Sequence, residues 1–353
     1  MDLKNTSELL SQKLKNCDFD SYAVFVSKNG VETFLHSENV DEDTYFDIAS
    51  MGKILVTSPL ILQAIGENKL SLEDQLGNFF EHVPQEKNVT IKQLLTHTSG
   101  IVRCPILPEA AAKGSEAVAA QIIDFPLAFE PGTNYVYSCN GMILLGFILE
   151  KLYGASLESL FETKLKGPLG YTRSKFNIAV GEPNAAVSYR SENVDGLSSP
   201  WDDENVRVLQ TSAGSGGQFF TLRDIKKYAE AILSKSELLY PKELYDIAEK
   251  DYTEKTFTEG RGLGWLIVDE RYAQTGKLFP SGSFGHCGHT GTSLFLNRDE
   301  DMYVILLTNA TRFQSMKNHF TAYDYNVVCK MREEIHNAIH TDLIDNHLIS
   351  RNI

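Results

Sequence analysis

The segment SYAVFVSKNGVETFLH, residues 21–36, alternates apolar and polar side chains on both sides of Asn29-Gly30. An Asn-Gly pair readily takes the positive φ angles of a tight turn, so this segment predicts a β-hairpin. Because a two-stranded hairpin is only marginally stable alone, it needs further strands to pair with. Three strand-like segments near the other end of the chain can supply them: GLGWLIV (262–268), GSFGHCGHTGTSLFLN (282–297) and DMYVILLTN (301–309).

Between these strands the apolar residues recur at helical spacing. In NGMILLGFILEKLYG (140–154), Met142, Leu145 and Leu149 lie on one helical face and Gly154 supplies a C-terminal stop. The same spacing predicts four further helices, and a polar helical tail begins near residue 312. The four are GKILVTSPLILQAI (52–65), TIKQLL (90–95), SLESLFETKL (156–165) and TLRDIKKYAEAIL (221–233).

The order of strands, helices, strands and helix predicts an α+β fold. An antiparallel sheet forms from the N- and C-terminal strands, is flanked by helices, and receives a mostly helical lobe as an insertion. We expect the sheet lobe to comprise residues 1–75 plus 210–353 and the helical lobe residues 76–209, with the active site at their interface. A length of 353 residues suits two such lobes.

Charge and hydropathy exclude several classes of protein. With 33 Lys+Arg against 47 Asp+Glu, the net charge of -14 repels phosphate backbones, and no basic run overrides it, so we expect no nucleic-acid partner. Apolar runs such as Met142 to Leu149 fall short of a membrane span, so we expect no membrane insertion. The start MDLKNTSELLSQKLK has no apolar h-region and predicts a cytoplasmic protein, with an export signal removed earlier as the alternative.

The five cysteines are scattered and never in CxxC spacing. This pattern argues against a disulfide framework and against a thiolate zinc site, and suits a reducing compartment. We expect no metal and no cofactor.

The first motif with chemical potential is Ser50-Met51-Gly52-Lys53, where a strand-like stretch meets a helix. Side chains at i and i+3 share a helical face, so the Lys53 amine can reach the Ser50 hydroxyl. A serine hydroxyl is a weak nucleophile until a base takes its proton. The alternative is an ordinary N-cap serine beside a solvated lysine.

Two further motifs offer a base and an oxyanion site. Tyr137 lies in YVYSCN, at the start of a predicted helix, and a neighbouring ammonium would lower its pKa and make the phenolate a usable base. The alternative is a core aromatic. The segment GHCGHTG (285–291) has glycines that let a substrate approach a strand edge, whose N–H groups are natural oxyanion donors; the alternative is a plain hairpin.

Taken in this order, the three motifs resemble the serine β-lactamase and penicillin-binding-protein superfamily. The similarity is greatest to the class C-like branch, which also contains esterases, DD-peptidases and D-aminopeptidases, and it extends over about residues 20–310. The resemblance implies a β-lactamase/transpeptidase-like fold. Supporting segments are NKLSLEDQL (68–76), TIKQLLTHTSGI (90–101), FEPGTNYVYSCNGMILLG (129–146), DDEN (202–205) and SAGSGGQFFTLRDI (212–225).

The resemblance implies a role for each matching residue. Ser50 would be the acylated nucleophile, Lys53 its activating partner, and Tyr137 the general base and proton shuttle. The backbone N–H groups of Ser50 and of His289, which follows the triplet His286 to Gly288, would form the oxyanion hole.

Three positions depart from the family pattern. Gly52 stands where the family usually has threonine. Cys139 stands where many members have an asparagine that holds the lysine and donates to a substrate acylamide, and a thiol replaces these hydrogen bonds poorly. His286 stands in place of a lysine, so a fixed charge for a substrate carboxylate becomes a mostly neutral imidazole. Cys139 could alternatively be a reactive thiol, if Lys53 lowers its pKa.

The sequence therefore predicts a serine acyl hydrolase of esterase or peptidase type with weak or absent β-lactamase activity, acting on small esters, amides or peptides. The alternative is a catalytically idle protein that binds peptide, cell-wall fragments or a protein partner. Three other features have plainer interpretations: His97 stabilises a turn, Cys287 faces away from His286, and Asp202, Asp203 and Glu204 form a solvated loop.

Overall fold

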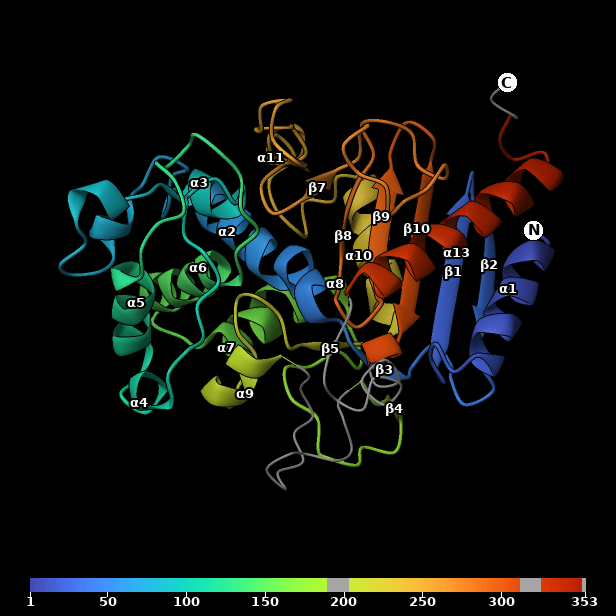
Figure 1. Cartoon of the computed structure of the whole chain (residues 1–353), viewed down its shortest axis with the longest axis horizontal. Helices are drawn as coiled ribbons and strands as arrows, with labels where there is room; N and C mark the ends of the chain where they lie inside the picture. Colours follow the sequence, from blue (N-terminus) through green and yellow to red (C-terminus); the bar gives the residue numbers. More distant parts are fainter. Residues whose placement is uncertain (189–202, 312–324, 351–353) are drawn as a thin grey trace.

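The computed structural model describes residues 1–188, 203–311 and 325–350. These residues form a seven-stranded antiparallel sheet in the order β2-β1-β10-β9-β8-β7-β6 (Figure 1). The predicted α+β class is confirmed, because the N-terminal hairpin pairs with the last strand, with Tyr22 opposite Thr308. The strands are β1 (Tyr22–Lys28), β2 (Val31–His36), β6 (Gly260–Arg261), β7 (Leu266–Ile267), β8 (Phe284–Cys287), β9 (Ser293–Asn297) and β10 (Met302–Thr308).

The predicted hairpin is confirmed at its turn, where Asn29 and Gly30 have φ angles of +52° and +73°. Its first strand differs from the expected alternation, because every residue of β1 is buried. Ala23 and Phe25 belong to one apolar cluster, whereas Val24 and Val26 belong to a second cluster on the opposite face. The sheet is therefore covered by helices on both faces.

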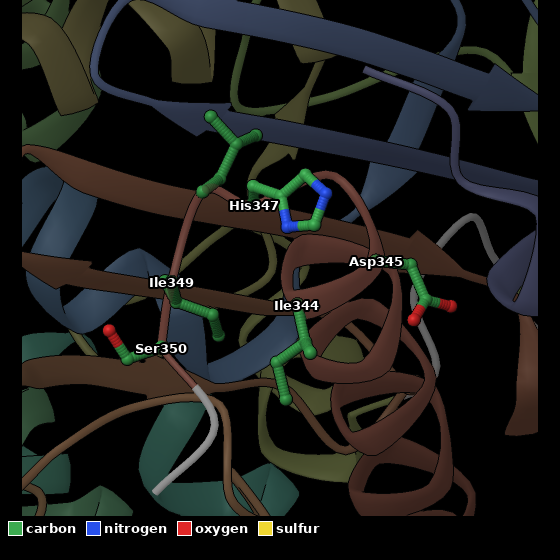
Figure 2. A pocket seen from close by; sticks show the side chains of 6 residues that line it. Ile344, Asp345, His347, Ile349 and Ser350 are labelled. Carbon is green, nitrogen blue, oxygen red and sulfur yellow. The ribbon is translucent and has the colours of Figure 1, made fainter.

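One face of the sheet is covered by the two ends of the chain. Helices α1 (Lys4–Lys15) and α13 (Tyr325–Asp345) lie side by side there (Figure 1), and Asp342 accepts hydrogen bonds from the side chains of Asn5 at 2.7 Å and Thr6 at 2.6 Å. The described part of the predicted C-terminal helical tail is thus helical. An open hollow at the end of α13, lined by Ile344 to Ser350, contains none of the predicted site residues (Figure 2).

The opposite face packs on α10 (Leu222–Leu233), whereas the helix that continues from the first motif, α2 (Ser58–Gly66), packs on α6. Ala49–Gly66 is the one described helical stretch that is long and apolar enough to span a membrane, with a mean hydropathy of 1.2. Because 78% of it is buried inside the protein, it is accounted for as a core helix.

The helical lobe surrounds α6 (Cys139–Tyr153), which ends at Gly154 with the predicted left-handed stop. Leu94 and Leu145 of this lobe share an apolar cluster with Phe25 and Ile305 of the sheet. Because one core runs through both lobes, the boundaries at 75/76 and 209/210 stay a prediction. The other helices are α3 (Ile91–Leu95), α4 (Pro108–Ala111), α5 (Ser115–Asp124), α7 (Leu157–Phe161), α8 (Gly167–Leu169), α9 (Glu204–Leu209) and α11 (Leu244–Ala248).

A second, three-stranded sheet that the sequence did not predict lies beneath the site. It consists of β4 (Ala185–Ala186), β3 (Tyr45–Asp47) and β5 (Phe219–Phe220), and its central strand β3 leads directly into the first motif. Short helical turns complete the chain: η1 (Ala49–Met51), η2 (Lys53–Thr57), η3 (Leu76–Asn78), η4 (Gln85–Lys87) and η5 (Glu162–Lys166).

Candidate active site

Ser50 lies at a tight turn between β3 and the core helix. It is the central residue of the 3₁₀ turn η1, which continues into the π-helical segment η2. Ala49 has a φ of +46°, unusual for a residue with a Cβ, and its N–H donates to Asp47 Oδ1 at 2.9 Å. The predicted junction of strand and helix is confirmed. Ser50 caps no helix, so the N-cap alternative is wrong.

Lys53 is fully buried and directed at Ser50. Its Nζ lies 2.9 Å from Ser50 Oγ and 2.6 Å from the carbonyl oxygen of Ser215. The alternative of a solvated lysine is therefore wrong. Burial lowers the pKa of Lys53, because an ammonium loses its hydration inside the protein. Burial thus disfavours the charged ammonium form beside the serine hydroxyl.

Tyr137 lies just before α6, with Lys53 Nζ 5.1 Å from its ring centroid. Its hydroxyl is within hydrogen-bonding reach of Ser50, and the ring keeps a partly exposed edge. The expected lowering of its pKa is wrong in direction: burial raises the pKa of Tyr137 well above its usual value, and outweighs the opposing effects of the Ser50 hydrogen bond and of Arg261. In the resting site Tyr137 is therefore a protonated phenol.

His97 holds the segment that carries Tyr137, as predicted for a turn-stabilising residue. Its Nδ1 accepts the Ser138 N–H at 3.3 Å, and its carbonyl oxygen accepts the Val136 N–H at 3.1 Å. Its ring lies 4.6 Å from the Tyr137 ring. Burial lowers the pKa of His97 well below its usual value, so the imidazole is neutral.

His286 faces the site from β8. Its ring centroid lies 6.0 Å from that of Tyr137, and its Nδ1 lies 2.7 Å from the carbonyl oxygen of Cys287. Only 3% of its surface is exposed, and burial lowers its pKa well below the usual value. The predicted neutral imidazole at this position is confirmed. Cys287 faces away, as expected, with its Sγ 3.0 Å from the Tyr272 hydroxyl.

The turn between β8 and β9 packs directly against the Ser50 turn. The hydroxyls of Thr290 and Thr292 donate to the carbonyl oxygens of Asp47 at 2.8 Å and Ile48 at 3.2 Å. A Cβ on Gly288 would lie 2.5 Å from the Ile48 oxygen, so only glycine allows this approach. The half-exposed His289 follows Gly288 here. That its N–H and that of Ser50 form an oxyanion hole stays a prediction.

Cys139 is the first residue of α6, and its Sγ lies 3.6 Å from Lys53 Nζ. The sulfur thus occupies the place beside the lysine that the sequence assigned to it. A thiol is a weak hydrogen-bond donor and acceptor, so it holds the amine less firmly than an amide would.

The described residues of the acidic segment, Asp203 and Glu204, have partners within the protein. Asp202 lies outside the described residues, whereas Asp203 caps α9 by accepting the Val206 N–H at 3.0 Å. Glu204 lies 3.9 Å from Arg103 in an exposed ion pair. Within residues 1–188, 203–311 and 325–350, no group of three or more His, Cys, Asp or Glu side chains is arranged to hold a metal ion.

The sequence reasoning missed Arg261, which enters the site from β6. Its side chain is 3% exposed, and its Cζ lies 5.4 Å from the Tyr137 ring centroid. It forms an ion pair with Glu259, and its Nη2 donates to the Tyr135 hydroxyl at 2.8 Å. The available signal was an arginine within an otherwise apolar strand segment, GRGLGWLIV. Such a residue is rarely fully buried without a partner.

Together these residues can perform acyl transfer through a serine. A hydroxyl, a buried amine and a phenol lie within one hydrogen-bonded group, and the tight turn of β8–β9 borders the nucleophile. These are the components that nucleophilic catalysis by serine needs: a nucleophile, a proton acceptor and a site for the developing oxyanion.

Comparisons with known proteins agree with this chemistry. A family model described as Beta-lactamase matches residues 6–324. A protein of Escherichia coli (strain K12) named "Putative D-alanyl-D-alanine carboxypeptidase" is 25% identical over 303 residues, which are 75% of this chain and 69% of that protein.

Two solved structures share the fold. "EstCE1, a hydrolase with promiscuous acyltransferase activity" superposes with a TM-score of 0.74 at 18% identity, covering 96% of this chain and 98% of its own. A class C beta-lactamase in complex with cefoxitin superposes with a TM-score of 0.73 at 19% identity, covering 95% of this chain and 98% of its own.

Proposed function

The chain belongs to the beta-lactamase family, a family of serine hydrolases, and we propose that it is itself a serine acyl hydrolase that forms an acyl-enzyme on Ser50. The resemblance predicted from the sequence is thereby confirmed. The observation that carries the proposal is the 2.9 Å contact between the buried Lys53 amine and the Ser50 hydroxyl. Burying a lysine is costly, and a buried titratable group in contact with a possible nucleophile is typical of an active site.

In the proposed reaction the neutral Lys53 amine takes the proton of Ser50 as Oγ attacks the substrate carbonyl. The direction of its pKa favours Lys53 as the first acceptor. The Tyr137 phenol then passes a proton to the leaving group and is reprotonated from Lys53. In this proposal Tyr137 keeps the predicted role of proton shuttle, and Lys53 takes the role of general base that the sequence assigned to Tyr137. Water later attacks the acyl-enzyme through the same path in reverse.

The oxyanion of each tetrahedral intermediate would be held by the N–H groups of Ser50 and His289. The support for this proposal is the close approach of Gly288 to Ile48, which brings the β8–β9 turn to the nucleophile. Donors fixed before the reaction stabilise developing charge without reorganisation, and removing one typically costs about 10²–10³ in rate.

We infer that the substrates are esters or amides that lack a carboxylate and an acylamide next to the reacting carbonyl. The His286 imidazole is neutral and Cys139 replaces an amide, so both groups that would hold a β-lactam or a D-Ala-D-Ala terminus are weakened. The proposal is therefore an esterase- or peptidase-type hydrolase with weak or absent β-lactamase activity.

The test is intact mass after incubation with a fluorophosphonate, which phosphonylates activated serines with loss of fluoride. We expect one adduct on the native chain and none on Ser50→Ala. An unlabelled native chain with intact circular dichroism would overturn the proposal and favour a protein that only binds peptide or a partner. A panel of short-chain esters, D-amino-acid amides and a cephalosporin then ranks substrates. A higher kcat/KM on the cephalosporin than on esters would contradict the substrate class.

A further inference from the structure

Arg261 is clamped between two tyrosine rings at the edge of the sheet. Its Cζ lies 5.3 Å from the ring centroid of Tyr135 and 5.4 Å from that of Tyr137. One nitrogen, Nη2, bonds both the Tyr135 hydroxyl and Glu259 Oε2. The other two nitrogens, Nε and Nη1, are buried and have no hydrogen-bond partner among the described residues. The guanidinium therefore keeps donors that the surrounding protein does not use.

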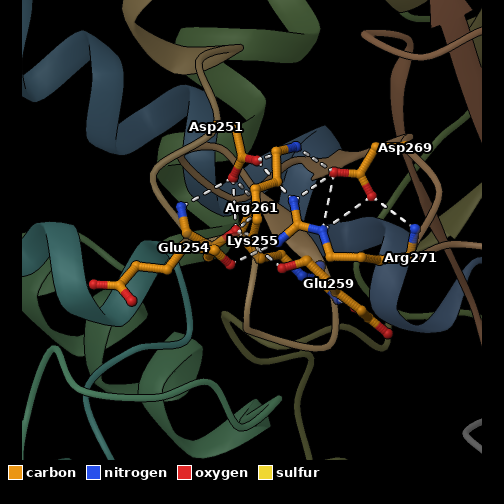
Figure 3. A network of polar contacts seen from close by, with 8 residues as sticks. Asp251, Glu254, Lys255, Glu259, Arg261, Asp269 and Arg271 are labelled. Atoms are coloured by element: carbon orange, nitrogen blue, oxygen red, sulfur yellow. Dashed lines mark hydrogen bonds and ion pairs between the residues drawn. The ribbon is translucent and has the colours of Figure 1, made fainter.

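An ion network holds the backbone of Arg261 in place (Figure 3). Asp251 Oδ1 accepts the Arg261 N–H at 3.2 Å, and its Oδ2 lies 2.7 Å from Arg271 Nη2. Asp269 joins the network through Arg271 and through Lys255, whose Nζ lies 2.8 Å away. Several charged groups that bond to one another fix this strand edge. Arg261 is therefore less mobile than an arginine on the protein surface.

The charged and titratable groups facing Tyr137 and Lys53 come from several elements. They are Cys139 from α6, Asp203 at the start of α9, Glu259 and Arg261 around β6, Tyr135, His97 after α3, and His286 from β8. Burial keeps both imidazoles neutral and disfavours the ammonium of Lys53. An arginine stays protonated even when buried. Among the described groups that face Tyr137, Arg261 is therefore the one that stays positively charged.

We propose that Arg261 is a positioning residue for proton transfer: its fixed charge beside Tyr137 and Lys53 stabilises the proton-accepting state of this pair. The inference rests on the proposed function of Ser50. It is consistent with the sign of each effect, since Arg261 lowers the pKa of both Lys53 and Tyr137, whereas Glu259 raises that of Tyr137. Whichever of the two accepts the Ser50 proton, loss of Arg261 makes it accept only at higher pH.

The experiment measures the rate of Ser50 labelling by a fluorophosphonate between pH 5 and 10, using intact mass, so it needs no natural substrate. On the acidic side of the pH profile, the labelling rate falls as the proton acceptor becomes protonated; we call this the acidic limb. We expect the acidic limb to move to higher pH by about one unit in Arg261→Gln, since a charge within ~4–6 Å shifts a pKa by about 1–3 units. Arg261→Lys, which keeps the charge, should stay close to the native limb.

Glu259→Gln gives a test of opposite sign. Removing this negative neighbour should move the acidic limb to lower pH, an effect that mere loosening of the strand edge cannot produce. The matched control is Arg298→Gln: Arg298 also pairs with a glutamate, Glu249 at 2.6 Å, and stacks on aromatic rings, but away from Ser50. It should leave the limb unchanged.

Coincident limbs for the native chain, Arg261→Gln and Arg261→Lys would overturn the inference, even if labelling is uniformly slower. If Arg261→Gln does not fold, the limbs of Arg261→Lys and Glu259→Gln decide: an unmoved limb in Glu259→Gln overturns the inference. Absence of labelling on the native chain is a different result, because it overturns the proposed function itself.

Discussion

Lys53 Nζ lies 2.9 Å from Ser50 Oγ and 2.6 Å from the Ser215 carbonyl oxygen, with no part of the lysine side chain exposed. Nζ donates a hydrogen bond to each of the two oxygens, so the Ser215 carbonyl holds the amine at the serine. In the proposed reaction this buried amine takes the proton of Ser50.

Lys53→Met should therefore abolish activity while the protein stays folded. Methionine has a similar volume and no charge to bury, so the lost hydrogen bond to Ser215 and the removed desolvation cost roughly offset, and the free energy of unfolding should change by less than about 2 kcal/mol. Ester hydrolysis should fall by about 10³-fold or more. Activity assays and urea unfolding check both parts. Near-native hydrolysis by this variant would contradict Lys53 as proton acceptor.

Gly288→Ala should separate the β8–β9 turn from the nucleophile. The new Cβ would lie 2.5 Å from the Ile48 oxygen and 2.2 Å from Thr292 Oγ1, so the turn must shift. We expect kcat to fall by about 10²-fold, as for loss of an oxyanion donor, and stability by about 1–3 kcal/mol. Gly167→Ala is the control, because its Cβ meets only the Glu162 oxygen at 3.4 Å. Unchanged kcat in Gly288→Ala would contradict the oxyanion assignment.

Cys139→Asn combined with His286→Lys should shift substrate preference toward acylamides that carry a carboxylate. The pair adds an amide donor beside Lys53 and a cation in the site. One charge-assisted hydrogen bond is worth about 1.5–3 kcal/mol, so the ratio of kcat/KM for a cephalosporin to that for a short-chain ester should rise by about tenfold or more. Cys17→Asn, at an exposed position with φ +54°, serves as control. An unchanged ratio would show that other residues exclude β-lactams.

His336 should make the protein sensitive to acid. It is fully buried on α13 with Nδ1 3.0 Å from the Gln274 carbonyl oxygen, and burial lowers its pKa to about 4 from an ordinary 6.5. Between these values the unfolded chain binds the proton more readily than the folded protein. Stability is therefore lost as pH falls from about 6.5 to about 4, by about 3 kcal/mol in total.

Urea unfolding of the native chain and of His336→Gln across this pH range measures that contribution. As pH falls, the unfolding free energy of the native chain should decrease more than that of His336→Gln, because only the native chain must keep this imidazole neutral. His82→Gln, at an exposed site, should follow the native chain. Parallel curves for the native chain and His336→Gln would contradict the assignment.

Features that depend on neighbouring residues were predictable from the sequence. The hairpin turn at Asn29-Gly30 follows from the φ angles these residues tolerate, and the stop at Gly154 from the same property. The contact of Ser50 with Lys53 follows from helical spacing, because residues i and i+3 meet on one face wherever the helix lies. The neutrality of His286 was also expected, since an imidazole loses its charge readily.

Features that depend on burial and on distant partners could not be predicted from the sequence. Lys53 and Tyr137 titrate in the directions that the surrounding protein imposes, and no local pattern states how much water each group keeps. Arg261 and its partner Tyr135 are 126 positions apart in the sequence. They meet because of the strand pairing at this edge of the sheet, which could not be predicted from the sequence. The sequence by itself determined that Ser50 and Lys53 meet, because backbone geometry fixes their spacing. Only the tertiary structure decided their charge states, because desolvation and long-range electrostatics exist only once the core has closed around them.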